Sequence, residues 1–337
     1  MFGFTVCCLP YTQPELGDRG SGIEGQVGSA HTSQASHDTA SPKEDPTLAS
    51  SSGVTIDLVA TDLDGTLLRS DRTISSRTAD AMAAAREVGI DIVWASARAR
   101  HSIHDLAESC GFTGRAIGAN GAVVLDLADG TPVIAGTTAI GADAVTTAML
   151  RVRELVPGVV FATVGPTRFV ADHGYAALCV FSDHHRDPLE MDTSSTVLAA
   201  EPTVKIVARH PDLSSVELYR TVAAAQVGGV ELTHSGAPYI EMSAAGVSKA
   251  SALSRMCQEL GVEQQSVAAV GDALNDVPML EWAGTALTTA NALPEIKSIA
   301  HRVLASNDDD GVAAYLEGLV QARLMADADT LGSARDR

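Results

Sequence analysis

Short apolar runs of strand length alternate with helical segments along much of this 337-residue chain, and this alternation most constrains its fold. Apolar runs at 54–60, 90–95 and 116–117 are separated by amphipathic stretches at about 76–88 and 101–110. Strands that alternate with helices in this way form a parallel sheet with helices on both faces. The first part of the chain therefore predicts a doubly wound α/β core.

The pattern changes after residue 121. Apolar runs at 123–126 and 132–134 flank Asp129-Gly130, a pair typical of a β-hairpin turn. A second hairpin is expected where runs 230–233 and 239–242 follow one another. Helices and further strands are expected between the two hairpins, the helices at 142–155 and 214–226 and the strands at 159–164, 169–171 and 204–208.

The α/β pattern returns with a helical stretch at 249–260 and an apolar strand at 267–270. We therefore predict an inserted α+β domain at 122–245, within a core that comprises residues 54–121 and 246–324. Residues 1–53 are rich in Ser, Gly, Thr, Pro and His and are predicted to be a disordered leader, while 325–337 are predicted to be a flexible tail.

The composition argues against several classes of partner. The net charge of −19 and pI near 4.8 disfavour binding to nucleic acid or to an anionic membrane, both of which require basic patches. No apolar run reaches the roughly 18 residues of a membrane helix. The five cysteines are odd in number and scattered, which favours a reducing cytoplasmic location. We expect a small-molecule partner, and a monomer or a homodimer.

Carboxylates follow two of the predicted strands at the point where each strand ends. Asp62 and Asp64 come directly after the first strand, and the run from Gly271 to Asp276 follows strand 267–270. Strand ends of a parallel sheet meet at one edge, where ligands bind. Oxygen ligands there suit Mg²⁺. Taken singly, each run could instead cap a turn or a helix.

Two further polar residues lie at suitable places in the pattern. Ser96 follows the strand that ends at Ala95, so its hydroxyl and backbone N–H could bind a phosphoryl oxygen, or the residue could only cap the strand. Lys249 opens the helix before strand 267–270. It could neutralise phosphate charge between the two carboxylate runs, or it could be an ordinary solvated lysine.

Together these residues resemble the four ordered motifs of the haloacid dehalogenase superfamily. The resemblance covers about residues 54–320, and its later segments are similar to the Cof-type subgroup of that superfamily. The matching residues are Asp62-Leu63-Asp64-Gly65-Thr66, Ser96, Lys249 and Gly271-Asp272-Ala273-Leu274-Asn275-Asp276, with Asn120-Gly121-Ala122, Gly246-Val247-Ser248-Lys249, Asn291-Ala292 with Lys297, and Asp310-Gly311-Val312-Ala313 for the subgroup.

The resemblance implies a Mg²⁺-dependent phosphatase whose insert is a C2B-type cap. Asp62 would attack phosphorus to form an aspartyl-phosphate, and Asp64 would act first as acid and then as base. Lys249 would complete the catalytic set. The implied phosphate- or substrate-binding residues are Ser96, Thr66, Arg98, Asn120 and Asn275, and the implied metal ligands are Asp62, Asp64 through its carbonyl, Asp272 and Asp276. Thr66 would also support its loop and orient Asp64, and Asn275 or Asp276 would complete or orient the metal shell.

This chain departs from the subgroup in two places. Ala97 stands where relatives usually have Gly. The segment Leu287-Thr288-Thr289-Ala290-Asn291-Ala292 stands where relatives often read Ala-Met-Gly-Asn-Ala, so it lacks that Gly. Beside the motifs, Arg98 and Arg100 could equally be exposed arginines without a substrate role. In the predicted insert, Lys205 and Arg209 are interpreted as having no special role, and the adjacent His184 and His185 as a solvated loop rather than a metal site.

The leading prediction for the substrate is a sugar phosphate. A phosphorylated cofactor such as a flavin or pyridoxal phosphate is equally admissible, and a phosphomutase would use the same residues. A different class of function is a non-enzymatic ligand-binding or regulatory protein on the same fold, which the intact Asp62, Asp64, Lys249 and Asp272 argue against.

Overall fold

The computed structural model describes residues 55–128, 131–184, 191–193 and 201–335. The predicted leader, the turn residues Asp129 and Gly130, and His185 lie outside the described residues.

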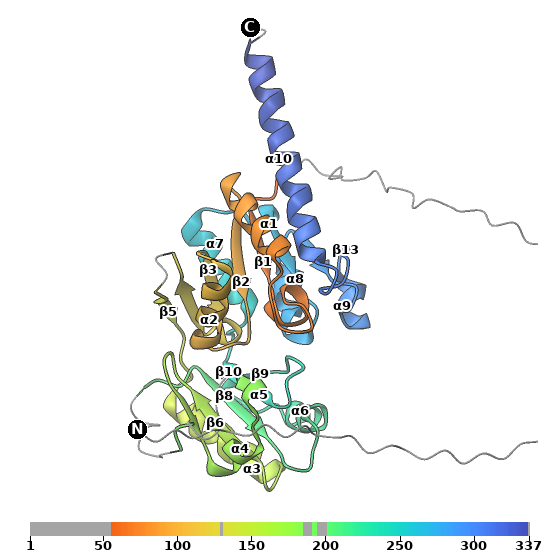
Figure 1. Ribbon diagram of the computed structural model, residues 1–337. Coiled ribbons are helices and arrows are strands. Elements are labelled where there is room, and N and C mark those ends of the chain that lie inside the picture. Colours follow the sequence, from red (N-terminus) through yellow and green to blue (C-terminus); the bar gives the residue numbers. More distant parts are fainter. Residues whose placement is uncertain (1–54, 129–130, 185–190, 194–200, 336–337) are drawn as a thin grey trace, which may run out of the picture. The chain divides into compact units, whose positions relative to one another are not determined.

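The first sheet has eight strands among the described residues, in the order β13-β12-β11-β1-β2-β3-β4-β5 (Figure 1). All neighbours from β13 to β3 pair in parallel, as the alternation of strands and helices predicts. The strands are β1 (Leu58–Thr61), β2 (Asp91–Ala95), β3 (Arg115–Gly118), β4 (Val123–Asp126), β5 (Val133–Thr137), β11 (Val267–Val270), β12 (Thr285–Thr288) and β13 (Arg302–Val303).

Neighbouring strand residues point to opposite faces of this sheet, and helices cover both faces. Val59 packs with residues of α1 (Ser76–Glu87), α2 (Arg100–Cys110) and α10 (Gly311–Arg335). Leu58 and Ala60 pack on the other face, with residues of α7 (Lys249–Leu260), α8 (Val277–Trp282) and α9 (Pro294–Ile299). The doubly wound core is therefore confirmed.

The first hairpin belongs to the core sheet and not to the insert. β4 and β5 pair antiparallel as predicted, but β4 also pairs with β3, with Ile117 opposite Val124. The prediction that residues from 122 onwards belong to the cap is wrong for this hairpin. An apolar hairpin can extend any open sheet edge, so the sequence pattern does not tell which sheet receives it.

The second sheet has five strands among the described residues, in the order β7-β6-β8-β10-β9, and all its neighbours are antiparallel. It lies within the predicted insert and is called the cap sheet below. Its strands are β6 (Val160–Val164), β7 (Phe169–Ala171), β8 (Lys205–Arg209), β9 (Val230–Thr233) and β10 (Ile240–Ala244), and the helices of this region are α3 (Ala142–Leu155), α4 (His173–Leu178), α5 (Phe181–His184) and α6 (Ser215–Ala224).

The two faces of the cap sheet differ in what they pack against. Residues of α3 and α6 pack with Phe161, Ile206 and Ala208 on one face. Val164 and Val207 face the other way and line a cavity against the core. The cap sheet thus presents one surface to its own helices and the other to the site.

The chain end is helical rather than irregular. α10 continues from Gly311 to Arg335, through the segment predicted to be a tail. None of the helices in the described residues is both long and apolar enough to cross a bilayer.

Candidate active site

Three carboxylates and one ammonium meet where the strand order of the core sheet reverses. The chain runs from β1 through β2 to β3 on one side and from β11 through β12 to β13 on the other. Ligands of open α/β sheets bind at such a reversal, at the carboxyl ends of the strands. Asp62 directly follows β1, and Asp272 is the second residue after β11. The backbone N–H of Asp62 donates to the carbonyl of Val270.

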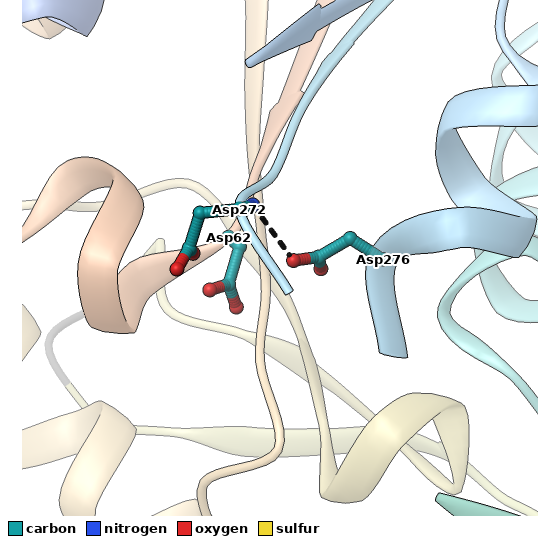
Figure 2. Close-up of side chains that lie close together, drawn as sticks. All are labelled: Asp62, Asp272 and Asp276. Atoms are coloured by element: carbon teal, nitrogen blue, oxygen red, sulfur yellow. Dashed lines mark hydrogen bonds between the residues drawn. The ribbon is translucent and has the colours of Figure 1, made fainter. Parts of the chain in front are cut away.

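Figure 2 shows the carboxylates of Asp62, Asp272 and Asp276 close together. One carboxylate oxygen from each residue lies within 4.8 Å of the others. Lys249 Nζ lies 2.5 Å from Oδ1 of Asp62 and 2.6 Å from Oδ1 of Asp276, and its side chain is fully buried. Lys249 is therefore no solvated lysine, and the four residues form a single buried charge cluster.

The cluster has an excess of negative charge. Burial raises the pKa of Asp62 well above its usual range, Lys249 opposes this, and Asp276 and Asp272 add to it. Burial and then Asp276 raise the pKa of Asp272 to about 6. Burial alone would lower the pKa of Lys249, but Asp276 and Asp62 raise it above its usual range. One ammonium does not balance the negative charge of three carboxylates, so the charge of the cluster favours binding of a cation.

The donor set therefore fits a hard divalent metal. Asp62 and Asp272 offer carboxylate oxygens, which Mg²⁺ prefers. Asp276 is more constrained, because Oδ1 accepts from Lys249 and Oδ2 accepts from the backbone N–H groups of Asp272 and Ala273, the former drawn in Figure 2. Asp276 thus orients the loop that carries Asp272.

Thr66 contacts Asp272 and not Asp64. Its hydroxyl donates to Oδ1 of Asp272 at 2.7 Å, so the prediction that it orients Asp64 is wrong. The turn from Asp64 to Thr66 also brings Gly65 close to Asp272. Gly65 has φ of +82°, and a Cβ there would collide with the Asp272 carboxylate. This explains why a glycine stands at that position.

Asp64 is held by Arg98. The guanidinium donates from Nε to Oδ2 at 2.7 Å and from Nη2 to Oδ1 at 2.6 Å. Burial would raise the pKa of Asp64, but these Arg98 contacts lower it below its usual range. The Arg98 side chain is only 10% exposed, so it is not a free surface arginine. The Asp64 side chain stands outside the three-carboxylate cluster.

Ser96 offers its side chain but not its backbone N–H. That N–H donates to the carbonyl of Ile117 in the sheet ladder, so the predicted role for it is wrong. The hydroxyl accepts from the N–H of Arg98 at 3.1 Å. Ala97 is not one of the non-glycine residues whose φ is positive in the described part of the chain. An L side chain is therefore accommodated at position 97 without backbone strain.

Asn120 and Asn275 bond to each other. Asn275 Nδ2 donates to Oδ1 of Asn120 at 3.1 Å, and Asn120 Nδ2 donates to the hydroxyl of Thr233 on β9. Oδ1 of Asn275 is buried and has no partner among the described residues. These bonds connect the Asp272 loop to the cap sheet.

A cavity of about 260 Å³ opens beside the cluster. Five of the predicted site residues line it: Asp62, Asp64, Ser96, Arg98 and Asn275. Thr66, Asn120 and Lys249 are buried. Asn120 and Lys249 bond to the lining residues Asn275 and Asp62, whereas Thr66 bonds to Asp272, which does not line the cavity. The core also contributes Arg72, Ala97, Ala99, His101 and Ser102 to the wall, and the cap contributes Val164, Phe169, Ser182, Asp183, His184, Lys205, Val207 and residues 235–239.

Several residues that hold the site were not predicted from the sequence. Asn291 Nδ2 donates to the carbonyl of Gly65 at 2.7 Å, and the hydroxyl of Thr289 donates to the same carbonyl at 3.3 Å. Thr289 and Asn291 thus both support the turn that contains Gly65. Lys205 is also buried, which overturns its interpretation as an unremarkable lysine. A lysine that begins a strand and is followed by three apolar residues was the signal for it.

The comparison with known families agrees with this geometry. The family model for haloacid dehalogenase-like hydrolases matches residues 59–316. The chain belongs to this family. As a Cof-type haloacid dehalogenase-like hydrolase it is an enzyme, a phosphatase of this superfamily, as the motifs imply. Hydrolases of this family generally use a divalent metal, and the carboxylate cluster is consistent with one.

Known haloacid dehalogenase-like proteins match most of the chain. Phosphatase YwpJ of Bacillus subtilis is 27% identical over 296 residues, covering 78% of this chain and 99% of that protein. The B. subtilis 5-amino-6-(5-phospho-D-ribitylamino)uracil phosphatase YitU is 27% identical over 271 residues, covering 77% and 96%. A solved haloacid dehalogenase-like hydrolase from B. subtilis is 25% identical with a TM-score of 0.66, covering 78% and 99%.

Proposed function

We propose that this protein is a Mg²⁺-dependent phosphatase that hydrolyses a small phosphate monoester, with a sugar phosphate as the leading substrate class. The observation that carries the proposal is the position of Asp62. It lines the cavity, accepts from the buried Lys249, and lies in a carboxylate cluster with Asp272 and Asp276. A cavity of about 260 Å³ suits a small molecule.

In this proposal an Asp62 carboxylate oxygen attacks phosphorus while the bond from phosphorus to the ester oxygen breaks. Asp64 acts in its protonated form, which requires its ion pair with Arg98 to open. It gives that proton to the departing oxygen, then takes one from the water that attacks the aspartyl-phosphate, and phosphate leaves Asp62. Ser96 and Lys249 bind the phosphoryl group, and Arg98 and Asn275 line the same cavity. Mg²⁺, held by Asp62, the Asp64 carbonyl and Asp272, would neutralise phosphoryl charge when bound.

The substrate class is supported by the relatives. YitU is named for a substrate with a phosphorylated ribityl chain, a polyol close in chemistry to a sugar phosphate. The leaving group would lie against the part of the cavity wall that the cap forms. The neutral hydroxyls of such a group match a wall that mixes apolar and polar side chains, among them Phe169 and Ser182.

The test is phosphate release from a panel of sugar phosphates, polyol phosphates, flavin mononucleotide and pyridoxal phosphate. Each ester is assayed with Mg²⁺, with EDTA, and with the Asp62→Asn variant. Mg²⁺-dependent release that the variant lacks supports the proposal and ranks the substrates. Release that survives in the variant would contradict the assignment of Asp62. Metal binding by folded protein without any release would favour a binding protein.

A further inference from the structure

Lys205 is a cap side chain that hydrogen-bonds to the Ser96 loop of the core. It lies on β8, and its Nζ donates to the carbonyl of Ala97 at 2.7 Å and to Oε1 of Glu241 on β10 at 2.7 Å. The Lys205 side chain is 5% exposed and that of Glu241 is fully buried. The ammonium of a buried ion pair in the cap thus also donates a hydrogen bond to one peptide group of the core.

That peptide group comprises the carbonyl of Ala97 and the N–H of Arg98, and its N–H donates to the Ser96 hydroxyl. Ala97 lies between Ser96, whose hydroxyl lines the cavity, and Arg98, which holds Asp64. On the core side the segment is already bound, because the Ser96 carbonyl accepts from the N–H of Asn120 and its hydroxyl accepts from the N–H of Arg98. Lys205 supplies the bond from the cap side.

Stability alone does not account for the pair. Removing an ammonium and a carboxylate from water is costly, and well-packed apolar residues of similar volume often stabilise a fold as well or better. Oε2 of Glu241 is buried without a partner among the described residues, which adds a further cost. What an apolar pair could not supply is the hydrogen bond to the Ala97 carbonyl.

We propose that Lys205 is a positioning residue, which rests on the proposed phosphatase function. It holds the Ala97 peptide when the cap lies against the core, and thereby sets the Ser96 hydroxyl and the Arg98 guanidinium for every substrate. Glu241 holds the Lys205 ammonium in place. Because the contact is made through a backbone carbonyl, it does not depend on the side chain at position 97, which fits the presence of Ala there.

The kinetic test compares the wild type with Lys205→Met/Glu241→Gln, which removes both charges at nearly constant volume. Substrates are para-nitrophenyl phosphate and a sugar phosphate. Positioning predicts that kcat falls between about 10- and 100-fold on both esters, with KM changed little. Lys205→Arg should restore part of kcat. A rise in KM for the sugar phosphate alone would instead make Lys205 a substrate ligand, and an unchanged kcat would overturn the proposal.

A second readout does not require turnover. Hydrogen exchange of the peptide spanning residues 96–100 should quicken in the double variant, because the segment loses its bond to the cap. The control is Arg209→Met, which breaks a second ion pair of β8, with Asp183 at 2.7 Å, that does not touch this segment. Unchanged exchange in the double variant would overturn the inference. An inactive wild type would overturn only the phosphatase proposal and leave exchange to decide.

Discussion

The Lys249 ammonium bridges two carboxylates, lying 2.5 Å from Oδ1 of Asp62 and 2.6 Å from Oδ1 of Asp276. Asp62 follows β1 and Asp276 precedes α8, so one side chain ties together the two halves of the core. The bond to Asp62 spans 187 residues of sequence.

Replacing Lys249 with Met should lower both stability and activity. Two buried carboxylates would lose their shared cation, and removal of one partner from a buried pair costs about 3–5 kcal/mol. Urea denaturation at neutral pH measures the stability change. Lys297→Met on α9 serves as the control and should have little effect on either quantity. Equal stability of the Lys249 variant and the wild type would contradict the buried cluster.

Replacing Asp64 with Asn should slow turnover by about 10²- to 10⁴-fold, the usual range for a lost acid–base group. The loss should be larger for a sugar phosphate than for para-nitrophenyl phosphate, because nitrophenolate leaves without a proton. Steady-state kcat on both esters checks this. Identical losses on the two esters would show that Asp64 does not protonate the leaving group.

The contribution of Asp272 to the stability of the metal-free protein, measured as the difference between the wild type and Asp272→Asn, should fall as pH rises from about 4 to about 6. The pKa of Asp272 is raised from 3.8 to about 6 in the folded state, and that of Asp62 is shifted in the same direction. At Asp272 the folded state therefore holds more of the proton than the unfolded chain does across this window, and the contribution of this group to stability is lost as its folded carboxyl ionises.

Mg²⁺ should reverse this trend, because it favours the ionised carboxylates. The increase in Tm on adding Mg²⁺ should be small below about pH 6 and grow above it, which thermal denaturation with Mg²⁺ and with EDTA measures. Asp272→Asn should abolish the increase at every pH. An increase of constant size from pH 5 to pH 8 would argue against Asp272 as a ligand.

Replacing Gly65 with Ala should impair metal binding as well as stability. Both Gly65 and Gly89 have left-handed φ, +82° and +79°, and an L residue costs about 1–2 kcal/mol in that conformation. Only at Gly65 would the added Cβ also meet Asp272, since nothing lies within 4 Å of a Cβ at Gly89. Calorimetric Mg²⁺ titration should thus show weaker binding for Gly65→Ala and unchanged binding for Gly89→Ala. Equal affinities in the two variants would refute the steric argument.

Much of the core was predictable because its signals are local. The apolar runs and helical periods between 54 and 117 correspond to β1, α1, β2, α2 and β3. The rule that parallel strands share an edge then brings Asp62 and Asp272 together without knowledge of any contact. The hairpin of β4 and β5 was predicted as a hairpin but assigned to the wrong sheet, because its local pattern suits either one.

The sequence by itself determined the order of strands and helices from β1 to β3, the two carboxylate runs at strand ends, and the family to which they belong. Only the tertiary structure decided which partner each polar side chain takes. Thr66 reaches Asp272 across 206 residues, and Lys205 reaches Ala97 across 108. Periodicity reports which face a side chain occupies. It carries no information on which group from a distant segment contacts that face. At this site those long-range contacts set the charge balance and the hydrogen bonds.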